Sequence, residues 1–182
     1  MEITTALLVL REYVDEDAAA FEAYQSDPRA RQFYAPAAVS PGELQALVSS
    51  FVHWAAEVPR RNWQLAIALR EAPATLVGSA GLRRAGAPAG VAEFGLELAP
   101  AYWGQGYATE AARALLAFGF SSLRLEAVRG TTVSANTQVT QLVRRLGFRQ
   151  VADRAGPAWL AARGWREVTW ELRHEDWRTH ER

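Results

Sequence analysis

Cysteine is absent from this chain of 182 residues. Its absence excludes disulfide bonds, a catalytic thiolate and metal sites built on thiolates. The three histidines, His53, His174 and His180, do not show the spacing of a metal-ligand set. We therefore expect neither a metal ion nor cysteine chemistry in this protein.

An excess of charge of one sign is also missing, because 20 basic residues balance 20 acidic ones. Proteins that bind nucleic acids usually carry a basic excess or a basic stripe. The arginine pairs at 60–61 and 83–84 are either solvated or contacts for the phosphates of a small cofactor. Nucleic acid is therefore not an expected partner.

Long apolar runs are missing as well. No stretch approaches the roughly 20 apolar residues that a membrane-spanning helix needs. Residues 1–5 lack the positive start and apolar run of a secretion signal. Apolar residues make up 49% of the chain, which is enough for one buried core. We expect a single domain over residues 1–182, with no membrane partner and a cytoplasmic location.

The hydrophobic pattern predicts a mixed order of strands and helices. A capping-box pattern at Ser40 and Glu43, with Pro41 between them, marks one helix start. Three consecutive strands indicate an antiparallel meander, and a later strand–helix–strand segment indicates a parallel pair. Strands are predicted at 7–11, 63–69, 76–82, 91–98, 125–133, from 148 and at 165–172, and helices at 18–24, 41–55, 109–120 and 138–146.

The segment 99–111 carries the strongest chemical signal. A strand ends, a turn with Gly104 and Gly106 follows, and a helix begins at once. Glycine allows positive φ angles and lets backbone N–H groups come close to a ligand. The N–H groups at a helix start bind anions, so a pyrophosphate group is the expected ligand. The alternative is a tight strand-to-helix turn without a ligand.

Two well-known phosphate motifs do not fit this segment. A P-loop requires a lysine, and the segment has none. A dinucleotide-binding fingerprint would place glycine or alanine where Thr109 stands, and it would open a series of βαβ units.

Residues 103–111, Trp-Gly-Gln-Gly-Tyr-Ala-Thr-Glu-Ala, resemble the acetyl-CoA motif of GNAT N-acetyltransferases. Trp103 departs from the Gln or Arg of the superfamily pattern but suits the RimJ/RimL-like branch, the ribosomal-protein N-terminal acetyltransferases. Segments 8–17, 76–82, 136–148 and 164–172 also resemble that branch, so the likeness covers nearly the whole chain.

The resemblance implies an α/β fold with a mostly antiparallel sheet, splayed between two parallel strands and flanked by helices. Acetyl-CoA would lie between the strands at 93–98 and 125–133, with its pantetheine arm along 96–98 and its pyrophosphate at 105–109. It assigns the cofactor site to Leu96, Glu97, Leu98, Trp103, Gly104, Gln105, Gly106, Tyr107, Ala108, Thr109 and Asn136.

The activity implied by the resemblance is direct acetyl transfer to a primary amine, most simply a protein N-terminal α-amine. An α-amine with a pKa of about 7.8 is partly neutral near neutral pH, whereas a lysine amine with a pKa of about 10.4 is almost fully charged. Two alternatives remain open: an enzyme for small amines such as polyamines, amino acids or aminoglycosides, and a module that binds acetyl-CoA without catalysis. A homodimer is expected from base rates.

Glu93 is the predicted catalytic base, acting directly or through water, because it lies on the strand that leads into the motif. Glu97 lies on the same strand face, and either residue is otherwise a solvent-facing side chain. Tyr34, Trp54 and Trp63 are candidates for lining the acceptor cleft, or else for core positions.

The chain departs from the family at two places after Asn136. Val139 replaces the usual serine or alanine, and Val143 replaces the tyrosine that serves many relatives as a general acid. Thr140 and Tyr107 are the substitutes that the sequence offers.

Overall fold

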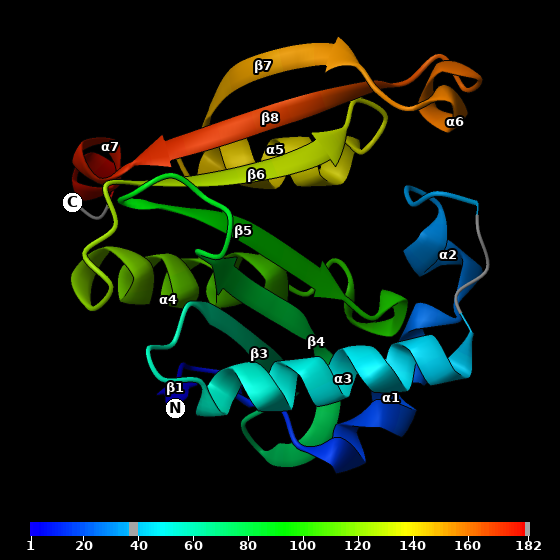
Figure 1. Ribbon diagram of the computed structural model, residues 1–182, viewed down its shortest axis with the longest axis vertical. Helices are drawn as coiled ribbons and strands as arrows, with labels where there is room; N and C mark the ends of the chain where they lie inside the picture. Colours follow the sequence, from blue (N-terminus) through cyan, green and yellow to red (C-terminus); the bar gives the residue numbers. More distant parts are fainter. Residues whose placement is uncertain (37–39, 181–182) are drawn as a thin grey trace.

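The computed structural model describes residues 1–36 and 40–180. Eight strands form one sheet in the order β1-β2-β3-β4-β5-β6-β8-β7 (Figure 1). Their bounds are β1 Glu2–Thr4, β2 Leu8–Glu12, β3 Asn62–Leu69, β4 Ala72–Arg83, β5 Val91–Leu98, β6 Ala127–Val133, β7 Arg149–Ala155 and β8 Arg166–Arg173. Among the described strands, only β5 and β6 pair in parallel. The expected mixed sheet with its meander and its parallel pair is confirmed.

Helices cover both faces of this sheet. They are α1 Ala18–Gln25, α2 Pro28–Arg31, α3 Pro41–Ala56, α4 Tyr107–Ser121, α5 Thr137–Arg145, α6 Ala158–Ala161 and α7 His174–His180. Helices α1 and α3 bury one apolar cluster against the sheet, whereas α4, α5 and α7 bury a larger one on the other face. None of the described helices is long and apolar enough to cross a bilayer.

The start of α3 forms as the sequence predicts. The Ser40 side chain accepts a hydrogen bond from the N–H of Glu43, and the Glu43 carboxylate accepts one from the N–H of Ser40 at 2.7 Å. Pro41 occupies the first helical position, where the missing N–H is not needed. The sequence did not predict β1, α2, α6 or α7. The first three elements span only three or four residues, and α7 begins with charged residues that read as a tail.

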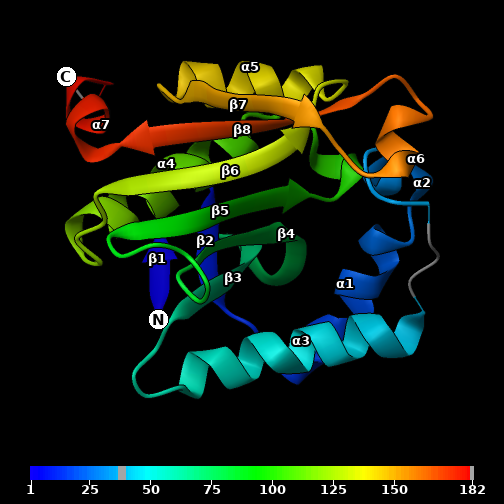
Figure 2. The same ribbon diagram turned by 45° about the horizontal axis from the view of Figure 1, so that its top comes forward.

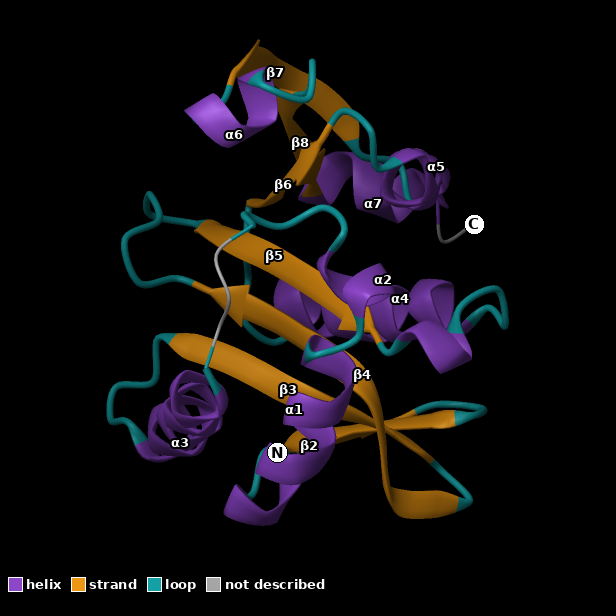
Figure 3. Cartoon of the chain, turned by 90° about the vertical axis from the view of Figure 1, so that its right-hand side faces the viewer, coloured by secondary structure: helices purple, strands orange, loops and turns teal. Residues whose placement is uncertain are grey.

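The sheet opens between β5 and β6. These strands pair only through Val91–Ala127, Ala92–Val128 and Glu93–Arg129. Beyond Glu93, β6 continues its pairing with β8 alone, and β5 continues with β4. Figure 2 shows the two strands diverging toward α2 and α6, and Figure 3 shows β6, β8 and β7 with α5 as a separate layer above β5. The expected splay of the sheet is therefore present.

Candidate active site

A cleft of about 860 Å³ occupies the opening between β5 and β6. The outer half of β5 forms one wall, and β6 with α5 forms the other. The start of α4 lies at one end, while α2 and α6 border the mouth. All the predicted cofactor residues except Gln105 line this cleft. The structure thus brings together side chains that are spread over 40 residues of sequence, from Leu96 to Asn136.

The glycine turn shapes the α4 end of the cleft. Gly104 and Gly106 have φ angles of 76° and 85°, a conformation that glycine adopts without strain. Gly106 is the N-cap of α4, and no side chain caps this helix. A Cβ atom added at either glycine would meet nothing within 4 Å. The first N–H groups of α4 are therefore presented to the cleft, as an anion site requires.

Trp103 fastens this turn to the end of β5. Its indole Nε1 donates a hydrogen bond to the carbonyl oxygen of Leu98 over 2.8 Å. Gln105, in contrast, is exposed, and its side-chain amide donates to the carbonyl oxygen of Ala101 over 3.1 Å. The Gln105 side chain therefore lies outside the cleft in which we predicted its contact with the cofactor.

Asn136 lies on the opposite wall, at the start of α5. Its Oδ1 accepts a hydrogen bond from the N–H of Val139 over 3.1 Å, which caps the helix and leaves the side-chain NH₂ group for a ligand. Val139 and Val143 also line the cleft. Neither can give up a proton. Tyr107 lines the cleft and Thr140 does not, so Tyr107 is the better placed of the two predicted substitutes.

Glu93 lies where the strands begin to part, with its side chain 63% exposed. Its Oε1 accepts a hydrogen bond from Nη2 of Arg83 over 3.1 Å. Arg83 in turn donates to Oε1 of Gln64 over 2.9 Å, and Gln64 donates to the hydroxyl of Ser79 over 2.7 Å. The predicted base is thus the outer end of a polar chain that runs into the sheet.

Glu97 belongs to the cleft in two ways. Its backbone is part of the β5 segment predicted to pair with the pantetheine arm. Its side chain meets α1 and the segment after α2, where it accepts hydrogen bonds from Tyr24 at 2.8 Å, Gln25 at 2.6 Å and Tyr34 at 3.0 Å. The sequence pattern did not reveal these three contacts, because the donors lie 63 to 73 positions away.

The three aromatic candidates for the acceptor cleft occupy different environments in the structure. Tyr34 lines the cleft. Trp54 instead packs against Phe51 within α3, with ring centroids 5.5 Å apart. Trp63 is buried against Phe118, and neither tryptophan lines the cleft. Of the two alternatives that the sequence left open for Trp54 and Trp63, the packing positions agree with these contacts.

At the mouth of the cleft, the segment after α2 contacts the segment after α6. Phe33 and Trp165 lie 5.8 Å apart between ring centroids, and Arg163 donates from Nη1 to the carbonyl oxygen of Gln32 over 3.3 Å. The Arg163 guanidinium also lies 5.6 Å from the Trp159 ring centroid. Of these residues, Phe33 and Trp159 line the cleft.

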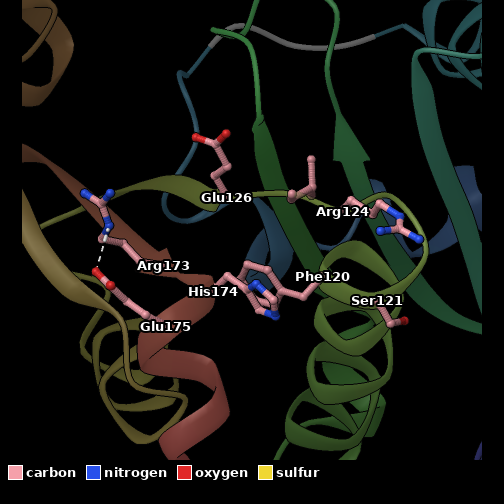
Figure 4. A pocket seen from close by; sticks show the side chains of 8 residues that line it. Phe120, Ser121, Arg124, Glu126, Arg173, His174 and Glu175 are labelled. Atoms are coloured by element: carbon pink, nitrogen blue, oxygen red, sulfur yellow. Dashed lines mark ion pairs between the residues drawn. The ribbon is translucent and has the colours of Figure 1, made fainter.

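A second hollow of about 700 Å³ lies at the far end of α4 (Figure 4). Phe120 and His174 stack within it at 5.3 Å, and Arg173 pairs with Glu175 at 3.3 Å. None of the predicted site residues lines it. The described residues also contain no cluster of acidic, histidine or cysteine side chains that would hold a metal ion. The cleft between β5 and β6 is therefore the candidate active site.

In this structure the sheet opens beside a glycine turn that begins a helix. This combination is the one expected of a protein that binds acyl-CoA. Residues 8–149 match the family model described as the acetyltransferase (GNAT) domain, and the chain belongs to this family. It is an acetyltransferase, and its cofactor is acetyl-CoA.

One relative is the uncharacterized N-acetyltransferase YoaA of Bacillus subtilis (strain 168). It is 25% identical over 149 residues, which cover 81% of this chain and 82% of the relative. A protein from Vibrio cholerae described as a putative ribosomal-protein-serine acetyltransferase has a similar fold, with a TM-score of 0.74, 21% identity and coverage of 95% and 97% of the two chains. Spermidine N-acetyltransferase from Vibrio cholerae, solved with CoA and spermine, gives a TM-score of 0.77 at 16% identity, covering 95% and 99%.

Proposed function

We propose that this enzyme acetylates a primary amine that carries one positive charge, and that a protein N-terminal α-amine of the ribosomal type is its acceptor. This assigns it to the RimJ/RimL-like branch and to the cytoplasm. The observation that carries the proposal is the cleft itself, in which an opened strand edge leads to uncapped N–H groups at the start of α4.

The residues of this cleft fit acetyl-CoA. Gly104 and Gly106 leave open space beside their Cα atoms, so a pyrophosphate could approach the N–H groups of Tyr107 and Ala108. Along β5, Leu96 to Leu98 would pair with the pantetheine arm as a neighbouring strand would. The buried indole N–H of Trp170, which also lines the cleft, has no hydrogen-bond partner among the described residues and would be satisfied by a ligand or water.

When bound, acetyl-CoA supplies the acetyl group as an activated thioester. Glu93 would then accept the proton of the attacking amine through water, while Arg83 fixes its carboxylate. As the new C–N bond replaces the thioester C–S bond, water or the Tyr107 hydroxyl, which lines the cleft, would give a proton to the departing CoA thiolate. Backbone N–H groups of β5 beyond the last β6 pair would donate hydrogen bonds to the acetyl carbonyl oxygen. An α-amine suits a site whose one candidate base acts through water. With a pKa of about 7.8, an α-amine loses its proton far more readily than a lysine side chain.

The charge balance of the cleft argues against a polyamine acceptor. A polycation would be bound best by a clear acidic excess. Three acidic and three basic side chains line the cleft instead, namely Glu93, Glu97 and Glu167 with Arg29, Arg83 and Arg145. A spermidine-type activity therefore remains the second candidate, supported by fold similarity alone.

The test combines cofactor binding with turnover. Titration of the purified protein with acetyl-CoA should show one tight site, and thiol release should follow when peptides with free N-termini are added. Peptides with blocked N-termini serve as the matched control. Since the chain contains no lysine, acetylation of the enzyme on lysine cannot contaminate the readout. Tight binding without thiol release across peptides, amino acids, polyamines and aminoglycosides would contradict the proposed activity.

A further inference from the structure

The Glu97 carboxylate is held by neutral donors only. Tyr24 and Gln25 both donate to Oε1, over 2.8 and 2.6 Å, and Tyr34 donates to Oε2 over 3.0 Å. None of the ion pairs formed by the described residues includes Glu97. Glu97 thus brings a negative charge to the cleft outside these ion pairs, while Arg31 and Arg83 lie close enough to act on the charge of the neighbouring Tyr34.

The donors fix the carboxylate but do not use all of its capacity. A carboxylate has about four lone-pair positions. Two are taken at Oε1 and one at Oε2, so one position at Oε2 remains for an incoming donor. Tyr24 and Gln25 are only 6% and 8% exposed, so the arrangement is built into the packed face of α1.

The two tyrosines remain donors under physiological conditions. Burial raises the pKa of Tyr24, and the nearby charge of Glu97 raises it further. The same two causes raise the pKa of Tyr34. Neither hydroxyl therefore competes with Glu97 for the role of the charged group.

Glu93 offers a clear contrast on the same strand. Arg83 already neutralises its carboxylate at 3.1 Å, and its side chain is 63% exposed. An ammonium group would gain less at Glu93, because solvent and an arginine already satisfy that carboxylate. At Glu97 an ammonium group would neutralise a partly desolvated carboxylate and form a charge-assisted hydrogen bond with it.

Apolar side chains line the same cleft as Glu97. Phe33, beside Tyr34, lines the cleft, and so do Trp159 and Leu160 of α6. We propose that Glu97 is the binding group for the acceptor ammonium, and that the acceptor is a monocation with an apolar or aromatic group next to its amine. This inference rests on the proposed acetyl transfer. It assigns binding to Glu97 and leaves proton transfer to Glu93.

The test compares two probes that share a carbon skeleton. 2-Phenylethylamine carries an ammonium group, and 2-phenylethanol carries a hydroxyl at the same place. Both are titrated by NMR into the protein saturated with CoA, so that no turnover occurs. The wild-type protein should bind the amine at least about tenfold more tightly than the alcohol, as expected for a hydrogen bond to a charged group.

The matched variants are Glu97→Gln and Glu93→Gln. Glu97→Gln should reduce the preference for the amine to about twofold or less, because it keeps the shape and removes the charge. Glu93→Gln should keep most of the preference. Only the backbone of Glu97 is assigned to the pantetheine arm, and the substitution leaves that backbone in place. The acetyl-CoA affinity of Glu97→Gln therefore reports whether the cleft is intact. If Glu97→Gln does not fold, Glu97→Ala takes its place, and it should likewise reduce the preference because it also removes the negative charge.

The results separate this inference from the proposed function. An unchanged preference in Glu97→Gln would overturn the role of Glu97, and tighter binding of spermidine than of 2-phenylethylamine by the wild type would overturn the monocationic acceptor. Acetyl transfer stands in both cases. A wild-type protein that binds no acetyl-CoA would instead remove the proposed function, and the inference with it.

Discussion

The indole N–H of Trp103 donates to the carbonyl oxygen of Leu98 across 2.8 Å, and this contact joins the end of β5 to the glycine turn. The Trp103 side chain therefore fixes the position of the glycine turn relative to the end of β5. The tryptophan that departs from the superfamily pattern has a structural reason in this chain, since its ring reaches a carbonyl group that would otherwise lack this donor.

Trp103→Phe should keep the ring packing and remove this donor. The lost hydrogen bond is worth about 1 kcal/mol, so acetyl-CoA affinity should fall by roughly fivefold. Calorimetric titration measures the change. Trp54→Phe, which alters a tryptophan outside the cleft, should leave the affinity as it is. Equal affinities for Trp103→Phe and the wild type would show that the turn does not depend on this contact.

Gly106→Trp should abolish acetyl-CoA binding, because a large side chain at this N-cap would fill the space in front of the α4 N–H groups. Gly86→Trp is a matched control. Gly86 has a φ angle of 79° against 85° for Gly106, and a Cβ at either position meets nothing within 4 Å. Both variants carry similar backbone strain of about 1–2 kcal/mol, but Gly86 does not line the cleft. Acetyl-CoA binding that survives in Gly106→Trp would place the pyrophosphate elsewhere.

Much of the fold could be predicted because its signals are local. The strand at Val91–Leu98 was predicted with its observed bounds, and the Ser40–Glu43 capping box fixed the start of α3. The glycine turn before α4 is also a local signal, since positive φ angles at Gly104 and Gly106 follow from residue type.

The acceptor side of the site could not be predicted in the same way. Tyr24, Gln25 and Tyr34 converge on Glu97 only because α1 and the segment after α2 pack beside β5. The sequence left the role of Trp63 open for the complementary reason. Its aromatic character is equally suited to a pocket and to a core, and only the packing against Phe118 decides between them.

Glu110→Ala should lower stability rather than cofactor affinity. Although Glu110 belongs to the acetyl-CoA motif, its Oε1 accepts hydrogen bonds from the Thr5 hydroxyl at 2.5 Å and from the N–H of Leu7 at 2.7 Å. These bonds tie the turn between β1 and β2 to the first turn of α4. Their loss should cost about 1–3 kcal/mol and lower Tm by several degrees. Scanning calorimetry measures the shift, and Glu16→Ala, at an exposed position, is the control. A Tm equal to that of the control would show that this tie contributes nothing.

Glu12 should make stability depend on pH. Burial alone would raise the pKa of its carboxyl, but hydrogen bonds from Arg60 at 2.7 and 3.0 Å and from the Met1 amino group outweigh burial and lower it. A carboxyl whose pKa is lowered on folding stabilises the fold above its unfolded pKa of about 4.3, and this contribution is lost as the pH falls through the folded pKa. Glu12→Gln should therefore cost about 1–2 kcal/mol at pH ~7 and progressively less toward pH ~3. Urea unfolding across this pH range tests the claim, with Glu71→Gln at an exposed turn as the control. A stability difference that stays constant with pH would mean that the Glu12 charge does not contribute.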